Sequence, residues 1–287
     1  MARPLRASEP PGRASEQDKS VSARRRRAPW SERFARSTIQ SLYQVPWLAS
    51  AVRSAVNLVV PDRLQEVRVA GGPLRGARLI VNLRAGKYWW LGTYEPWIQE
   101  LLVDTLRPGM RAWDVGAFFG YHTLLMRRLA GPHSVVALEP DPENRAHLLR
   151  HLALNDARDV EVLPVAAGAI SSRGRMQSHR VSSGNEVVPI ESGGELDIVT
   201  LDSLLERHAP PDLVKVDVEG AESAVLAGAG RLIEQIRPTW IVELHSPDPG
   251  PFARFRRAGY RIEMAGRKVD AVSSDLPGGP VHLVARP

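Results

Sequence analysis

The sequence predicts an α/β fold, with a mostly parallel sheet of about seven strands, helices on both of its faces and a small extension of strands and helices before it. From residue 112 onward, short apolar runs alternate with amphipathic segments, which is the pattern of β–α–β units. Helix-start signals separate the runs, and the clearest is Asp141 followed by Pro142. Hydrophobic residues make up 43% of the 287 residues, which suffices for the core of one such domain.

The strands predicted for the sheet come from the apolar runs. In chain order they are Ala112–Val115, Ser134–Leu138, Val160–Val165, Leu213–Val216, Thr239–Leu244, Tyr260–Met264 and His282–Ala285. A further short strand is expected at Ile198–Leu201, and residues 169–195 are interpreted as an insertion or hairpin. The helices between the strands are expected at Tyr121–Leu129, Pro142–Asn155, Asp202–Arg207 with Asp202 as N-cap, a segment ending at Leu226, and Phe252–Arg257.

Three stretches differ in composition and pattern. We divide the chain into a disordered basic leader (1–36), an extension with a helix, a hairpin and a lid (37–98), and the main domain (99–287). The helix of the extension is expected within 37–60, where apolar residues recur at helical spacing, and the hairpin within 68–83. An aromatic cluster in the last part of the extension is interpreted as a lid or core element, with a pocket wall as the alternative.

The positive charge of the chain is concentrated in its N-terminal part. Residues 1–60 hold 11 Lys and Arg against 4 Asp and Glu, whereas residues 61–287 hold 27 against 28. A domain that binds nucleic acid in its own cleft should carry the positive patch itself, so nucleic acid is not the expected partner. Contact of residues 20–60 with a membrane surface is the alternative role for the leader and the helix after it.

Several functional classes are excluded by what the sequence lacks. The chain has no cysteine, which excludes disulfides, thiolate catalysis and cysteine-ligated zinc. No uninterrupted apolar run reaches the ~18 residues that a membrane-spanning helix needs. The first residues show no apolar core and include Glu9, Glu16 and Asp18, which argues against a secretory signal. We therefore expect a cytoplasmic enzyme, and the sequence leaves its oligomeric state open.

The strongest functional pattern is an Asp-x-Gly-x-x-x-Gly stretch that begins at Asp114, at the end of an apolar run. Gly116 lets the backbone approach a ligand, and Gly120 opens a helix whose N-terminus favours a carboxylate. The next apolar run ends in Glu139, which can accept two hydrogen bonds from ribose hydroxyls. These features predict a site for S-adenosylmethionine (SAM), whose ammonium and sulfonium suit an acid. A dinucleotide site would need G-x-G-x-x-G, which Phe118 breaks, and an ordinary strand-turn-helix is the structural alternative.

Polar residues also follow two later strands. Asp217 and Glu219 come after one strand, and Glu243 and His245 close the next. Because the carboxyl ends of parallel strands meet at one edge of a sheet, we expect these side chains near the SAM motif. They are candidate bases, since methyl transfer to a hydroxyl requires removal of its proton, and Lys215 is a candidate ion-pair partner of Glu219. The residue types could also bind a metal, but no tight spacing enforces it, so no metal is predicted.

Seven short motifs occur through the chain in a fixed order. They are Leu-Gly-Thr-Tyr-Glu (91–95), Asp-Val-Gly-Ala-Phe-Phe-Gly-Tyr-His-Thr (114–123), Leu-Glu-Pro-Asp-Pro (138–142), Leu-Pro-Val-Ala-Ala-Gly (163–168), Leu-Asp-Ser-Leu (201–204), Lys-Val-Asp-Val-Glu-Gly-Ala-Glu (215–222) and Val-Glu-Leu-His (242–245). In order and spacing they resemble the FkbM-like family of SAM-dependent methyltransferases. The family usually has Asn at the position of Phe118 and often at that of His151, and the basic leader lies outside the resemblance.

The resemblance implies a class I, Rossmann-like domain that binds S-adenosyl-L-methionine. At the matching positions it implies cofactor contacts by Asp114, Gly116, Ala117, Gly120, Thr123, Glu139 and Ala166, and catalytic roles for Asp217, Glu219 and His245. Analogy with the family favours O-methylation of a small-molecule, saccharide or lipid-linked acceptor. Two alternatives stay open: an RNA or protein methyltransferase anchored by the basic leader, and a non-catalytic interaction module with the same fold.

Overall fold

The computed structural model describes residues 61–178, 185–189, 194–245, 248–264, 267–268 and 281–287. The predicted basic leader, the predicted helix within 37–60 and the predicted membrane contact through residues 20–60 lie outside the described residues. In the part of the chain that is described, no helix is both long enough and apolar enough to cross a membrane.

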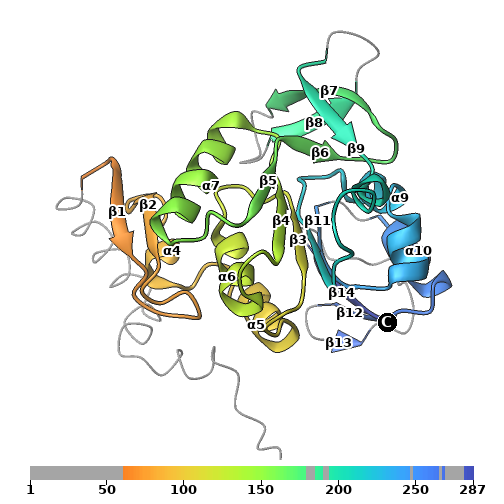
Figure 1. Cartoon of the computed structure of the whole chain (residues 1–287), viewed down its shortest axis with the longest axis horizontal. Helices are drawn as coiled ribbons and strands as arrows, with labels where there is room; N and C mark the ends of the chain where they lie inside the picture. Colours follow the sequence, from red (N-terminus) through yellow and green to blue (C-terminus); the bar gives the residue numbers. More distant parts are fainter. Residues whose placement is uncertain (1–60, 179–184, 190–193, 246–247, 265–266, 269–280) are drawn as a thin grey trace, which may run out of the picture.

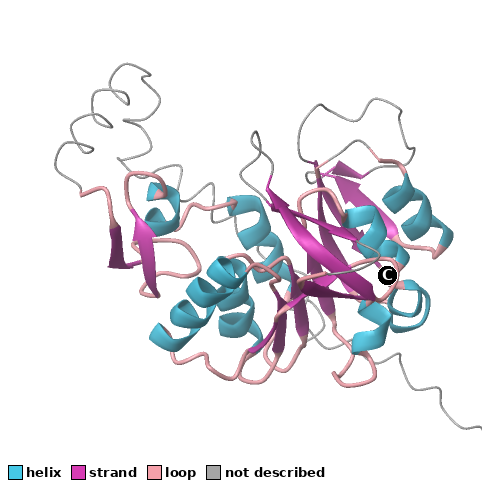
Figure 2. Ribbon diagram, turned by 90° about the horizontal axis from the view of Figure 1, so that it is seen from above, coloured by secondary structure: helices cyan, strands magenta, loops and turns pink. Residues whose placement is uncertain are grey.

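One large sheet with helices on both faces organises the molecule (Figures 1 and 2). In spatial order its strands are β13 (Arg267–Lys268), β12 (Arg261–Met264), β14 (Val281–Arg286), β11 (Thr239–Leu244), β10 (Leu213–Val216), β3 (Ala112–Val115), β4 (Val135–Leu138) and β5 (Glu161–Leu163). All pairs from β11 to β5 are parallel, and β14 is antiparallel to both of its neighbours. The fold class is confirmed: the seven predicted strands form the sheet, and the two-residue β13 extends its edge.

The helices form two layers, each over its own hydrophobic core. One layer holds α5 (Pro96–Thr105), α6 (Tyr121–Ala130) and α7 (Pro142–Leu154); the other holds α8 (Leu201–Leu204), α9 (Glu222–Ala227), the π-helical turn η2 (Leu232–Ile236) and α10 (Gly250–Arg257). Successive residues of β10 alternate between the two cores, Leu213 in the first and Val214 and Val216 in the second. Lys215 therefore points to the face covered by α5 and α6.

Helix starts follow the predicted capping chemistry in one case and depart from it in another. Asp141 caps α7 as predicted, since its Oδ1 accepts the N–H groups of Glu143 and Asn144 at 2.8 and 2.9 Å. Asp202 does not cap α8. Thr200 does so, because the preceding strand ends at residue 199, and the carboxylate of Asp202 instead accepts two N–H groups at the start of η2.

A second sheet lies beside the first (Figure 1). Its strands, in spatial order, are β6 (Val165–Ala167), β9 (Leu196–Val199), β7 (Ser172–Ser178) and β8 (Asn185–Pro189). The predicted single strand over residues 160–165 is split at Pro164, because proline has no N–H with which to continue a ladder. The strand predicted at 198–201 lies two residues earlier, and the segment interpreted as an insertion or hairpin contains the antiparallel pair β7 and β8.

The extension packs on the outside of α7. Its hairpin, β1 (Leu64–Arg68) and β2 (Arg78–Asn82), is followed by the short helix α4 (Lys87–Leu91). Asn155, which follows α7, accepts the N–H of Arg78 at 2.8 Å and donates to its carbonyl at 2.7 Å. The side chain of Asn155 thus forms hydrogen bonds with backbone groups on the free edge of β2, where another strand would otherwise pair.

His151 joins this edge to the SAM motif. Its Nε2 accepts the N–H of Ile80 at 2.9 Å, and its Nδ1 donates to the carbonyl of Phe119 at 2.8 Å. This pair of bonds requires a neutral ring, and burial lowers the pKa of His151 below its ordinary value. His151, at a position where the family often has Asn, is therefore a link between the hairpin and the SAM motif.

Candidate active site

A cavity of about 420 Å³ opens beyond the carboxyl ends of β3, β4 and β10. Five of the predicted site residues line it: Gly116, Glu139, Ala166, Asp217 and Glu219. The other five are not among its lining residues: Asp114, Ala117, Gly120, Thr123 and His245. Two lining residues that the sequence analysis missed, Asn144 and Met176, come from α7 and from β7 of the second sheet.

The glycines of the SAM motif are required by neighbouring protein atoms. Gly116 has a φ of +81°, and a Cβ at this position would lie 1.8 Å from the carbonyl oxygen of Asp217. Gly120, with φ +87°, would place a Cβ 2.2 Å from Leu148 Cδ1. The sequence analysis explained Gly116 by the approach of a ligand; in the structure the close approach is that of the loop after β10.

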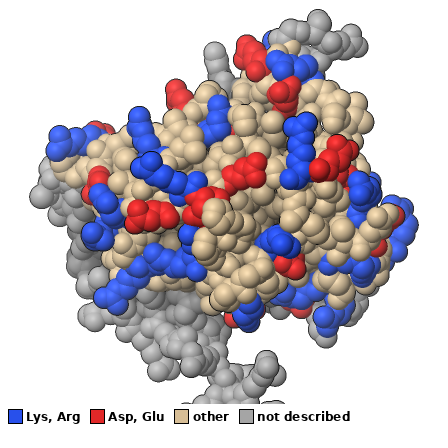
Figure 3. Space-filling model, viewed as in Figure 1, with Lys and Arg blue, Asp and Glu red and all other residues tan. Residues whose placement is uncertain are grey.

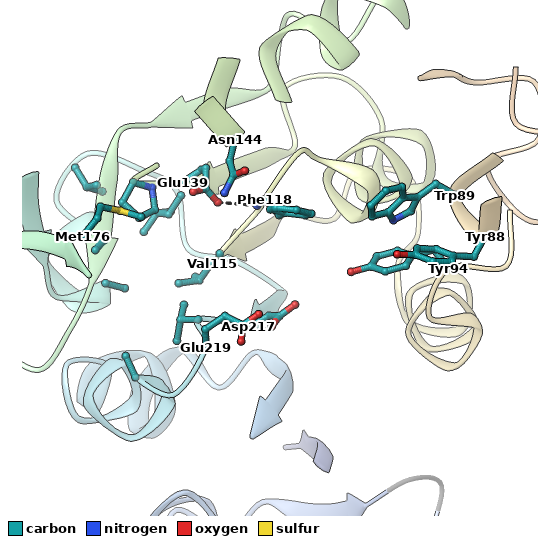
Figure 4. A pocket seen from close by; sticks show the side chains of 18 residues that line it. Tyr88, Trp89, Tyr94, Val115, Phe118, Glu139, Asn144, Met176, Asp217 and Glu219 are labelled. Carbon is teal, nitrogen blue, oxygen red and sulfur yellow. Dashed lines mark hydrogen bonds between the residues drawn. The ribbon is translucent and has the colours of Figure 1, made fainter. Parts of the chain in front are cut away.

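Glu139 holds the turn of the SAM motif and faces the cavity. Its Oε2 accepts the N–H of Phe118 at 2.7 Å (Figure 4). Its Oε1 accepts the N–H of Asp141 at 2.9 Å. Burial raises the pKa of Glu139 to about 7, against the opposite effect of these two bonds and of Asn144. Each carboxylate oxygen keeps a second lone pair, so Glu139 can still accept hydroxyl groups. Phe118 is 42% exposed and takes up a φ of +51°.

Asp114 and Thr123 bond to each other below the cavity floor. Asp114 is fully buried, and its Oδ2 accepts the hydroxyl of Thr123 at 2.6 Å. Burial raises the pKa of Asp114, although Lys215 and Thr123 act in the opposite sense. In the structure Asp114 and Thr123 contact other protein groups, and neither is among the residues that line the cavity. Their predicted direct contact with SAM therefore stays a prediction.

Lys215 lies between two acids. The parallel register places it opposite Asp114, and its Nζ lies 3.6 Å from Asp114 Oδ1 and 3.0 Å from Asp217 Oδ2. Burial opposes the charge of Lys215, but Asp217 and Asp114 raise its pKa above the ordinary value. Burial likewise opposes the charge of Asp217, and Lys215 holds the pKa of that acid below its usual range. The candidate pairing of Lys215 with Glu219 is not formed. Lys215 pairs with Asp217 and Asp114 instead, and the chain leaves the extended conformation at Glu219, whose φ is +53° and whose carboxylate lies beside His245.

His245 is surrounded by carboxylates. Its Nδ1 lies 2.7 Å from Glu222 Oε1, and its Nε2 lies 3.5 Å from Glu219 and 3.9 Å from both Asp217 and Glu243. Partial burial would lower the pKa of His245, but the hydrogen bond and charge of Glu222, with the other acids, raise it to about 9. At neutral pH His245 is therefore an imidazolium that donates hydrogen bonds.

A further acid, Glu95, joins this group from the N-cap of α5. Its Oε2 lies 3.6 Å from Nε2 of His122, and neither atom has a hydrogen-bond partner among the described residues. Burial raises the pKa of Glu95 and lowers that of His122 well below its ordinary value. One oxygen each of Glu95, Asp217 and Glu243 lie within 4.8 Å of one another. The sequence analysis did not include Glu95, although the motif at 91–95 was a signal for it.

Aromatic side chains form the far side of the cavity (Figure 4). Tyr88, Trp89 and Tyr94, here called the aromatic wall, come from α4 and the segment after it. The rings of Tyr88 and Tyr94 stack with centroids 5.7 Å apart, and Tyr94 also stacks on His122 at 5.3 Å. These three residues line the cavity, and Trp89 and Tyr94 also pack against the hydrophobic core, so the cluster provides a pocket wall and a core element together.

Comparison with known proteins places the chain in a family. The model of the methyltransferase FkbM domain matches residues 114–262, which are 149 of the 287 residues. This range contains Glu139 and the loops after β10 and β11, and so includes the edge of the sheet at which the cavity opens.

Among characterised proteins, the hexuronic acid methyltransferase AglP of Haloferax volcanii is 32% identical over 152 residues, 51% of this chain and 61% of that protein. Two solved structures are similar at lower identity. The FkbM methyltransferase of Methylobacillus flagellatus KT is 20% identical with a TM-score of 0.44, over 63% of this chain and 48% of that one. Fibrillarin of Aeropyrum pernix, solved with S-adenosyl-L-methionine, is 13% identical with a TM-score of 0.41, over 63% and 68%.

The chain thus spans less than two thirds of the length of its characterised relative. The family match confirms the resemblance drawn from the seven sequence motifs, and the observed strand order agrees with a class I SAM-dependent methyltransferase domain. The chain belongs to the FkbM methyltransferase family.

Proposed function

We propose that this chain transfers a methyl group from SAM to a hydroxyl oxygen of a saccharide. The observation that carries the proposal is that one cavity contains both halves of the reaction. Glu139 and Asn144 lie on one side of it and the aromatic wall lies on another, with Phe118 between them and with Asp217 and Glu219 below (Figure 4). Its volume of about 420 Å³ is in the range of small-molecule sites.

The cofactor would occupy the side of the cavity that belongs to the FkbM motif. Glu139 would accept the ribose hydroxyls, beside the apolar strip that Val165, Ala166 and Ala167 contribute. Asp114 and Thr123, bonded to each other under the motif, would fix its turn. The acidic lining complements the ammonium and sulfonium charges of SAM.

A saccharide suits the other side of the cavity. Aromatic faces such as those of Tyr88 and Trp89 can pack on the C–H face of a sugar ring. No lysine or arginine occurs among the described residues that line the cavity, so a phosphate backbone would find no partner there. The name of the relative, a hexuronic acid methyltransferase, supports the same acceptor class.

The reaction is an in-line displacement in which the acceptor oxygen bonds to the methyl carbon as the sulfur–carbon bond breaks. The protein must align the two and accept the hydroxyl proton. We assign that proton to Glu219, which lines the cavity, because Lys215 already occupies one oxygen of Asp217 and because His245 is protonated. Asp217 would then orient the acceptor.

The test is incubation of the purified chain with methyl-labelled SAM and a panel of acceptors, followed by mass spectrometry. The panel contains neutral oligosaccharides, uronic acid-containing oligosaccharides, RNA and a protein extract. We expect the label on saccharide oxygen, and Glu219→Gln should lower kcat by about 10²–10⁴. Label on RNA or protein, or SAM binding without transfer to any acceptor, would contradict the proposal.

A variant that lacks residues 1–60 distinguishes the proposed function from an RNA or protein methyltransferase that uses the basic leader as an anchor. A saccharide methyltransferase should keep its turnover in this form. An RNA or protein methyltransferase held by the basic leader should lose binding of its acceptor.

A further inference from the structure

We infer that Glu95, Asp217 and Glu243 form a binding site for a divalent cation. They come from three separate elements: the N-cap of α5, the loop after β10, and β11. One oxygen of each lies within 4.8 Å of the other two. The sequence analysis predicted no metal because these acids are not closely spaced along the chain; the fold gathers them at one edge of the sheet.

The spacing of the oxygens fits a single ion. Metal–oxygen distances are about 2.1 Å for Mg²⁺ and about 2.3–2.6 Å for Ca²⁺, so two ligands of one ion lie at most about 4.2–5.2 Å apart. The observed limit of 4.8 Å lies below the maximum for Ca²⁺ and above that for Mg²⁺, so small side-chain rotations would bring the three carboxylates onto a smaller ion. Carboxylate oxygens are the ligands that Mg²⁺, Mn²⁺ and Ca²⁺ prefer.

A second observation, independent of the three acids, points to the same ion. The side chain of His122 is only 6% exposed, and its Nε2 has no hydrogen-bond partner in the described chain. That atom lies 3.6 Å from Oε2 of Glu95, which is also buried without a partner. Buried polar atoms in native proteins are almost always satisfied, so two adjacent exceptions require an explanation. A cation bound by Glu95 would satisfy the carboxylate, and imidazole nitrogen is itself a ligand for divalent transition-metal ions.

The side chains around the site carry a net negative charge, which favours binding of a cation. The basic side chains of the described residues that contact its acids are Lys215 and three histidines, His122, His245 and His282, the last with Nε2 3.2 Å from Glu243 Oε2. The neighbouring carboxylates outnumber them: Glu95, Asp114, Asp217, Glu219, Glu222 and Glu243. The three proposed ligands keep 24%, 19% and 14% of their side chains exposed, so an ion from solvent can reach them.

The cation gives the acceptor side of the cavity a positive charge, which its lining residues do not provide. This step rests on the proposed function. A cation beside Asp217 would bind a sugar hydroxyl, ease the loss of its proton, and pair with the carboxylate of an acidic sugar. A uronic acid would thereby find a charge partner in a cavity whose described lining has neither lysine nor arginine.

The test is a titration of the full chain with Mn²⁺, after treatment with a chelator and dialysis, with free Mn²⁺ followed by electron paramagnetic resonance. We expect one saturable site. Loss even of an outer-shell partner typically weakens metal binding by about 10–100-fold, so Glu95→Gln and Glu243→Gln should each weaken Mn²⁺ binding by at least about tenfold. Thermal melts in the absence of metal check that the variants are folded.

Two matched controls remove a carboxylate without removing a proposed ligand. Glu219 lies beside His245 in the same acidic group, and Glu206 is exposed on the surface. Glu219→Gln and Glu206→Gln should change Mn²⁺ affinity by less than about threefold, the size of a diffuse charge effect. A loss in Glu219→Gln equal to that in Glu95→Gln would show attraction by the acidic group as a whole and would overturn the site. Absence of saturable binding to the unsubstituted chain would overturn it as well.

This measurement contains neither SAM nor acceptor. A negative result in the transfer assay therefore does not contradict the cation site, and a negative Mn²⁺ titration does not contradict the proposed methyl transfer.

Discussion

Lys215 and Asp217 form an ion pair at the end of a buried strand, with Nζ 3.0 Å from Oδ2 and only 4% of the lysine side chain exposed. The same ammonium lies 3.6 Å from Asp114, which is fully buried. Two carboxylates therefore share one ammonium at a corner of the cavity, with Asp114 buried beneath the floor and Asp217 in the lining. An arrangement of this kind depends strongly on its central member.

Lys215→Met should destabilise the fold severely. Removal of one partner of a buried pair typically costs about 3–5 kcal/mol, because it leaves the other charge without compensation. Urea unfolding followed by circular dichroism measures the loss. The double variant Lys215→Met with Asp114→Asn removes one of the stranded charges and should recover part of the stability. A loss below ~1 kcal/mol in the single variant would mean that the corner is hydrated and the pair contributes little.

The link between the hairpin and the SAM motif should make stability depend on pH. Burial lowers the pKa of His151 below its ordinary value, so the folded state holds the ring neutral, and the neutral ring can accept the N–H of Ile80 at Nε2. The resulting stability is present above the unfolded pKa of about 6.5 and is lost as the pH falls below it, by up to about 1.4 kcal/mol per pH unit. The free energy of unfolding at pH 7.5, 6.5 and 5.5 measures this slope.

Two variants isolate the contribution of this histidine from other titrating groups. His151→Asn cannot titrate, so its stability should fall less steeply between pH 6.5 and 5.5. His133→Asn changes an exposed histidine whose φ of +56° asparagine tolerates, and it should keep the slope of the unsubstituted chain. Equal slopes in all three proteins would show that His151 does not titrate with folding.

The sequence predicted the sheet well because strand positions and helix starts are local properties. Apolar runs and the Asp141–Pro142 start signal fixed β3, β4 and α7 within one or two residues. The strand predictions were wrong where contacts between distant segments, rather than the local sequence, decide which sheet a strand joins. Pro164 stood inside an apolar run, and nothing local to it shows that the chain leaves one sheet for another at that residue.

The site was harder to predict than the fold because its charges act on one another through space. The acids at strand ends were expected to gather, and Asp217 and Glu219 do line the cavity. Whether an imidazole there is a base or an imidazolium depends on Glu222, which is bonded to His245, and the sequence alone does not reveal that contact. Glu95 joins the group only because α5 packs across the sheet.

Gly116→Ala should test the steric role of the first glycine in the motif. A Cβ there would lie 1.8 Å from the carbonyl oxygen of Asp217, and the φ of +81° is unfavourable for alanine. We expect a loss well above the ~1–2 kcal/mol that left-handed backbone alone costs, together with loss of SAM binding. Gly109→Ala is the matched control, because its φ is +90° and its Cβ would meet nothing within 4 Å. Similar losses in both variants would leave only the backbone conformation as the cause.

SAM affinity should rise with pH up to about neutrality if Glu139 holds the ribose. The free protein keeps this carboxyl at a pKa of about 7, and a ribose hydroxyl needs the ionised form to donate to. Below pH 7 SAM binding must therefore expel a proton, and affinity should fall by up to about tenfold per pH unit. Calorimetric titrations from pH 5.5 to 8.5, in buffers of different ionisation enthalpy, measure both the affinity and the released proton. Glu139→Gln should bind SAM more weakly and without that proton, and an unsubstituted chain whose affinity is flat across this range would exclude Glu139 as the ribose acceptor.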